Sequence, residues 1–94
     1  MTTRVTDVAD EQRFEITDEE GTVLGVAEYR RRPGVVVFTH TEVDPAFEGH
    51  GVGSALAAGA LDSVRESGER VVALCPFIRA YLERHPEYED LTRR

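Results

Sequence analysis

The chain has 94 residues, of which 40% are hydrophobic and 31% are charged, as expected for a soluble globular domain with one modest core. Acidic side chains outnumber basic ones by 18 to 11, and the net charge of −7 disfavours nucleic acid and anionic membranes while tolerating a cationic amine as partner. The single cysteine excludes an internal disulfide framework and a cysteine-rich zinc site, and no apolar run approaches the ~20 residues of a membrane span.

The first half of the chain predicts antiparallel strands. Residues 1–12 are mostly polar, so we expect a loosely ordered arm or edge; they contain no visible signal peptide, which makes a cytoplasmic location the default. Residues 13–18 and 23–31 flank a turn signal and predict a hairpin. Gly25 within the second strand indicates a bulge or a close backbone approach. Residues 35–43 are rich in β-branched side chains and form the strongest predicted strand.

The second half predicts a helix, a strand and a second helix. Residues 51–67 place apolar and small side chains at helical spacing, which lets the helix lie close against a sheet. Residues 70–74 form a short apolar run suited to a buried parallel strand. A second helix begins at Pro76 and ends before Pro86, and we expect residues 89–94 to be loosely ordered.

This order of elements predicts one α/β (α+β) domain over residues 1–94. Its sheet is expected to be mixed, with about four strands, and to be packed against two helices. The crossover from residues 35–43 through the first helix to residues 70–74 is where an opening for a ligand is expected in such a sheet.

A glycine-rich loop lies in this crossover. Gly49, Gly51 and Gly53 leave successive backbone N–H groups unshielded at a helix N-terminus, which is typical of a phosphate cradle. No lysine follows Gly53, as a Walker A loop requires, and the chain is too short for a Rossmann fold. The alternative is that the loop is only a tightly packed strand-to-helix turn.

The loop resembles the acetyl-coenzyme A loop of the GNAT superfamily of N-acetyltransferases, whose pattern is Arg or Gln, two residues, Gly, one residue, then Gly or Ala. Glu48 occupies the first position of this pattern, and its carboxylate departs from it. Other motifs extend the resemblance to a subgroup of small GNAT-like proteins over roughly residues 5–91. In chain order they are Arg13–Glu15, Gly25–Tyr29, His40–Val43, Cys75–Ile78 with Tyr81, and His85–Tyr88.

The resemblance implies acetyl-coenzyme A as the cofactor. Its pantetheine arm is expected beside the strand end, at Thr41 and Val43, and its pyrophosphate on the N–H groups of the loop and helix start. The implied phosphate-binding residues are Gly49, His50, Gly51, Val52, Gly53 and Ser54. The chain lacks helices and closing strands that full-length relatives use for the acceptor pocket. We therefore expect an open site for an amine on a small molecule or protein, in a monomer or a small homo-oligomer.

Cys75 is the first candidate for catalysis. A thiol at a helix N-terminus has its thiolate stabilised by the helix dipole, so it could act as an acid for the departing thiolate or as a transient acetyl acceptor. The alternative is a small buried hydrophobic side chain at a strand end, which is common for a free cysteine.

His40 and Glu42 are two residues apart on a strand and therefore share one face, which we place next to the thioester. Either could take a proton from the attacking ammonium, and His40 is the preferred base. The alternative is a polar pair facing solvent. His50 could contact phosphate or merely fill the loop, and three dispersed histidines with one cysteine predict no metal site.

Two hypotheses from different classes follow. The first is an acetyl-coenzyme A-dependent N-acetyltransferase, and the second is a non-catalytic coenzyme A-binding module with a regulatory or interaction role. A third possibility is a structural domain whose glycine loop binds nothing.

Overall fold

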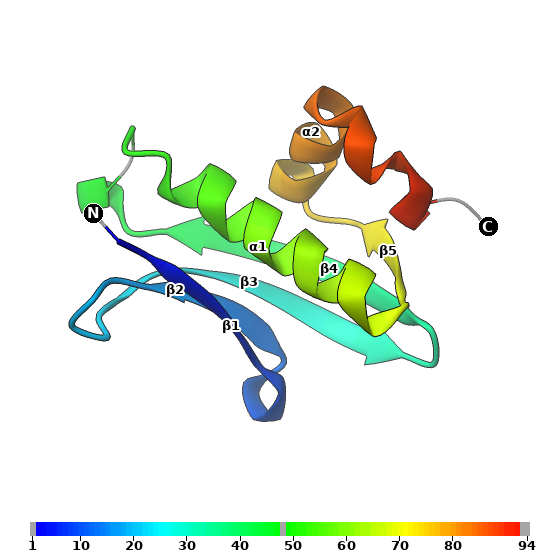
Figure 1. Cartoon of the computed structure of the whole chain (residues 1–94), viewed down its shortest axis with the longest axis horizontal. Coiled ribbons are helices and arrows are strands. Elements are labelled where there is room, and N and C mark those ends of the chain that lie inside the picture. Colours follow the sequence, from blue (N-terminus) through cyan, green and yellow to red (C-terminus); the bar gives the residue numbers. More distant parts are fainter. Residues whose placement is uncertain (1, 48, 93–94) are drawn as a thin grey trace.

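The computed structural model describes residues 2–47 and 49–92, in which one face of a five-stranded sheet carries both α-helices (Figure 1). The strands stand in the sheet in chain order, and only the last pair is parallel. The elements are β1 (Arg4–Val8), β2 (Arg13–Thr17), β3 (Val23–Arg32), β4 (Val35–Val43), α1 (Val52–Ser67), β5 (Arg70–Ala73) and α2 (Pro76–Arg84), with 3₁₀ segments at Ala9–Glu11, Pro45–Phe47 and Pro86–Thr92. The predicted mixed sheet with two helices is confirmed, with one strand more than expected.

The additional strand is β1, which lies within the segment predicted to be a loosely ordered arm. It pairs antiparallel with β2, and Val5 lies opposite Ile16. A Cβ atom on Gly59 of α1 would come within 2.6 Å of Val5, so the helix approaches the strand closely because it has a glycine there. Apart from Val5 and Val8 this edge strand is polar, and its sequence alone therefore reads as an arm.

The C-terminal segment is also more ordered than its polar sequence indicates. In the 3₁₀ segment Pro86–Thr92, the side chains of Tyr88 and Leu91 are buried. The Tyr88 hydroxyl donates a hydrogen bond to Asp62 of α1 at 2.8 Å. The prediction of a loose tail from residue 89 is therefore wrong as far as residue 92, and residues 93–94 lie outside the described part of the chain.

The core lies between α1 and the sheet. The predicted apolar stripe of α1 is buried, and its members are Leu56, Ala57, Ala60, Leu61 and Val64. Three rings from neighbouring strands pack beneath it, with the centroid of Phe14 at 5.3 Å from that of Tyr29 and at 5.9 Å from that of Phe38. These rings fill the core between the middle strands and α1.

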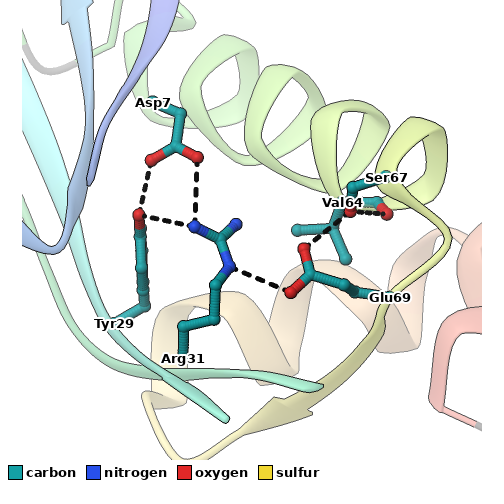
Figure 2. A network of polar contacts seen from close by, with 6 residues as sticks. All are labelled: Asp7, Tyr29, Arg31, Val64, Ser67 and Glu69. Atoms are coloured by element: carbon teal, nitrogen blue, oxygen red, sulfur yellow. Dashed lines mark hydrogen bonds and ion pairs between the residues drawn. The ribbon is translucent and has the colours of Figure 1, made fainter. Parts of the chain in front are cut away.

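A polar network joins β1, β3 and the end of α1 on the same side of the sheet (Figure 2). Tyr29 donates its hydroxyl hydrogen to Asp7, and the Arg31 guanidinium donates to Asp7 at 3.3 Å and to Glu69 at 2.9 Å. Ser67 donates to the same Glu69 carboxylate at 2.6 Å. The edge strand is thus held by specific hydrogen bonds as well as by the packing of Val5.

The Tyr29 hydroxyl should make the stability of the protein fall at alkaline pH. Burial and the hydrogen bond to Asp7 raise the pKa of Tyr29 from 10.0 to about 12. Its stabilising effect is complete below pH 10 and is lost as the pH rises towards 12, because only the unfolded chain releases the proton over that range. The slope is about 1.4 kcal/mol per pH unit for each such tyrosine.

We therefore expect Tyr29→Phe to cost about 1 kcal/mol at pH 8 and to flatten the fall in stability between pH 10 and 12. Urea unfolding at several pH values measures both effects. Tyr88→Phe is the matched variant, since burial and Asp62 raise the pKa of Tyr88 to about 12 as well. An unchanged alkaline slope in Tyr29→Phe would contradict the assignment.

Candidate functional site

A bulge in β4 decides which side chains face the helices. Tyr29 of β3 lies opposite Phe38, but its neighbour Glu28 lies opposite His40, so Thr39 is an extra residue in β4. Phe38 is buried beneath the helices before the bulge, and Thr41 lies on that same side after it, opposite the buried Ala27. Because of the bulge, Thr41 faces the helices, whereas its neighbours in β4 face the other side of the sheet, here called the open face.

Beyond the bulge, one edge of β4 has no neighbouring strand. The parallel pairing with β5 ends where Phe38 lies opposite Ala73, although β4 continues to Val43. The chain leaves β5 through Cys75, whose backbone N–H donates to the Phe38 carbonyl at 3.1 Å, and enters α2. In the described part of the chain, no strand covers residues 39–43 on this edge, so an extended ligand can lie beside them.

The glycine loop closes one end of this opening. Gly49 and Gly51 have φ angles of 85° and 76°, a left-handed conformation that other residues rarely adopt. Gly51 is the N-cap of α1 and has no side chain to cap it, which leaves the N–H groups of the first turn to an incoming acceptor. A Cβ atom on Gly53 would lie 2.8 Å from the Phe77 ring, so this glycine allows α1 and α2 to pack closely.

These elements enclose a cleft of about 470 Å³ between the end of β4, the start of α1 and α2. The residues that line it are Thr41, Val43, Phe47, Gly49, Gly51, Val52, Gly53, Ser54, Phe77 and Arg84. All of the predicted cofactor-binding residues except His50 line this cleft. His50 lines a separate hollow with Thr3 and Ala55.

The sequence analysis did not assign Phe47, Phe77 or Arg84 to the site. For Phe77 and Arg84, the sequence offered one indication, their spacing. They are seven residues apart on one helix and therefore lie on the same face, two turns apart. Glu48, the departure from the family pattern, lies outside the described residues.

Cys75 lies behind the cleft rather than in its lining. Its side chain is buried, with 2% of the residue exposed, and it is the N-cap of α2. Its Sγ atom lies 3.1 Å from Oγ1 of Thr41, and either atom could donate the hydrogen. Because Thr41 lines the cleft, its contact with Cys75 links the buried thiol to the cleft lining.

His40 and Glu42 share one face of β4, and Nε2 of His40 lies 2.9 Å from Oε1 of Glu42. Both side chains are exposed, and both lie on the open face of the sheet, opposite the side that carries Thr41 and Val43. The structure therefore brings the pair together but separates it from the cleft by the thickness of one strand. To contact both the cleft and the His40–Glu42 pair, a ligand must pass around the free edge of β4.

Within residues 2–47 and 49–92, no group of three or more metal-ligating side chains is placed to hold an ion. In the same described ranges, neither α-helix has the length and apolar character needed to cross a bilayer.

Known proteins resemble the chain in fold and sequence. It matches a solved structure assigned as a GCN5-like N-acetyltransferase from Staphylococcus aureus with a TM-score of 0.72 and 27% identity, over 96% of this chain and 87% of that one. A protein assigned as phosphinothricin N-acetyltransferase matches with a TM-score of 0.58 and 25% identity, over 78% of this chain and 50% of that one. Nourseothricin acetyltransferase matches with a TM-score of 0.52 and 24% identity, over 86% of this chain and 65% of that one. This match shows a shared fold alone.

No curated protein is similar enough to count as a match. The family model of the GCN5-related N-acetyltransferases matches residues 13–91, which include the bulged strand, the glycine loop and both α-helices. The chain therefore belongs to the GCN5-related N-acetyltransferase family.

Proposed function

We propose that this protein is an N-acetyltransferase that uses acetyl-coenzyme A to acetylate an amine of a small molecule or protein. The observation that carries the proposal is the cleft between the free edge of β4 and the uncapped start of α1. A strand edge offers N–H and C=O groups to an extended arm, and a helix N-terminus offers N–H groups to phosphate. The polar groups of the strand edge fit the pantetheine of coenzyme A, and the N–H groups of the helix start fit its diphosphate.

The residues of the site have separate roles in this proposal. Thr41 and Val43 align the pantetheine, and the residues from Gly49 to Ser54 that line the cleft, all but His50, hold the phosphates. Bound acetyl-coenzyme A supplies the thioester whose carbonyl carbon accepts the amine. Since β5 leaves this edge of β4 uncovered, an amine can arrive from the open face, where His40 or Glu42 accepts its proton.

On the other side of β4, the Thr41 hydroxyl is within hydrogen-bond distance of Cys75. A proton passing from the thiol through this hydroxyl would neutralise the departing coenzyme A thiolate. Cys75 then acts through Thr41, because its own sulfur does not line the cleft. In the other route, the acetyl group would pass from the coenzyme A sulfur to Sγ of Cys75, the thiol proton would go to the released coenzyme A, and the amine would then take the acetyl group from Cys75. Because the thiol is buried, this route requires it to become accessible from the cleft.

The second candidate function is a coenzyme A-binding module without catalysis. Two observations favour it: Cys75 is buried, and His40 and Glu42 face away from the cleft lining. The two candidates differ in turnover alone, since both require the cofactor to bind.

Calorimetric titration with acetyl-coenzyme A tests the common part of both candidates. We expect a dissociation constant in the micromolar range, and ligand at 100 times that constant should stabilise the folded protein by about 2.7 kcal/mol. Acetate and pantetheine, which lack phosphate, serve as controls and should bind far more weakly. No heat of binding and no thermal shift at millimolar ligand would refute both candidates.

A further inference from the structure

Arg84 ends α2 at the opening of the proposed cofactor cleft. It lies seven residues after Phe77, and both residues line the cleft because seven residues make two helical turns. The Phe77 ring packs over Gly53 in the first turn of α1. Arg84 and the first residues of α1 therefore border the same cavity, although they come from different helices.

Arg84 is the only charged side chain among the described residues that line this cleft. Other charged hollows on the surface contain carboxylates, such as Glu83 and Glu89 beside β5, or Asp18 and Glu19 beside β1. The chain as a whole has a net charge of −7, whereas the described residues that line this cleft carry only a positive side-chain charge. An anion placed in the cleft is attracted by the charge of Arg84.

The Arg84 guanidinium is also available to a ligand. It is exposed and makes no hydrogen bond or ion pair with any residue in the described ranges. The other arginine of α2, Arg79, instead donates to the Ala73 carbonyl at 3.4 Å and lines the hollow beside β5. A guanidinium presents a rigid fork of donors that matches two phosphate oxygens.

The glycine loop itself has no cationic side chain to offer. Where the family pattern places Arg or Gln, this chain has Glu48, and the rest of the loop up to Ser54 is neutral apart from His50, which lines another hollow. We propose that Arg84 binds a phosphate group of coenzyme A and so provides, from α2, the charge that the loop lacks. The inference rests on the proposed function and adds a residue that determines affinity for the phosphorylated part of the cofactor.

Substitution of Arg84 tests the proposal through phosphate-dependent binding. By calorimetry, we expect Arg84→Gln to bind coenzyme A about tenfold more weakly than the wild type, since one charge-assisted pair is lost. Arg79→Gln is the matched control on the same helix and should bind as the wild type does. Arg84→Lys, which keeps the charge without the fork, should recover part of the affinity. Thermal unfolding of each variant without ligand checks that the fold is retained.

Three ligands identify the group that Arg84 contacts. If Arg84 pairs with the diphosphate, the substitution lowers the affinity for dephospho-coenzyme A by the same factor as the affinity for coenzyme A. If Arg84 pairs with the 3′-phosphate, only the affinity for coenzyme A falls. Either result supports a phosphate contact. Equal affinities of Arg84→Gln and Arg79→Gln for coenzyme A, or an equal loss with phosphate-free pantetheine, would overturn it. Absence of binding by the wild type would instead refute the proposed function.

Discussion

Gly51→Val is expected to weaken acetyl-coenzyme A binding by about 100-fold, because the loss of two charge-assisted hydrogen bonds is enough for such a change. Gly51 has a φ of 76°, a conformation that a β-branched residue does not adopt without strain. The backbone must therefore rotate at the N-cap of α1, and the first N–H groups of the helix no longer converge on the cleft. Calorimetric titration measures the change directly.

Gly34→Val is the matched control for this experiment. Gly34 has the same φ of 76°, and, as at Gly51, a Cβ atom there would meet nothing within 4 Å. It lies in the turn between β3 and β4, at the opposite end of β4 from the cleft. Both variants should lose similar stability on urea unfolding, but Gly34→Val should retain its affinity. A similar loss of affinity in both would show that general destabilisation is responsible.

Cys75→Ala is expected to lower kcat by about 100-fold or more, as removal of a group that handles protons in catalysis typically does. Acetyl-coenzyme A should still bind with nearly unchanged affinity, because Cys75 does not line the cleft. The assay follows release of the coenzyme A thiol with a panel of primary amines, including a polyamine and a lysine peptide. Mass spectrometry of the wild type after incubation with acetyl-coenzyme A separates a covalent route, which leaves an acetyl group on Cys75, from a proton relay, which does not.

Thr41→Val separates a relay from simple packing at Cys75. Valine keeps the shape of threonine but removes the hydroxyl that lies 3.1 Å from the thiol. If the proton passes through this hydroxyl, Thr41→Val should reduce kcat nearly as much as Cys75→Ala, with little effect on stability. If Cys75 is only a buried hydrophobic side chain, both variants should keep the kcat of the wild type, and another group must supply the proton. Absence of turnover by the wild type with every amine would instead favour the non-catalytic module.

Local patterns predicted most of the fold. The β-branched run of β4, the apolar stripe of α1 and the start of α2 at Pro76 each contain their own signal. The strand β1 lacks such a signal, because it is stabilised by distant groups, namely Gly59 packing on Val5 and Tyr29 bonding to Asp7. A polar edge strand can be recognised only when its partners are in place.

The site was predictable only where backbone conformation defines it. Alternating glycines indicated the loop, and the expected place of the pantetheine beside the strand end came from the resemblance to the family and stays a prediction. The bulge at Thr39 could not be foreseen, although it decides that Thr41 faces the helices and His40 faces away. Arg84 was not assigned to the cleft for a similar reason, since its place in the cleft lining depends on the angle at which α2 leaves β5.

The order of the strands has a consequence for how the protein folds. Because β1 to β4 are neighbours in both sequence and sheet, each can pair with its predecessor after a short loop closes, which is a rapid event. Only β5 must return across α1 to pair in parallel, which makes its docking the slower step. The cleft needs β4, α1 and α2 together, so it is complete only after that docking. If the proposed function is correct, binding of coenzyme A reports on the last stage of folding, and a chain halted at the antiparallel meander would have its sheet but no cleft.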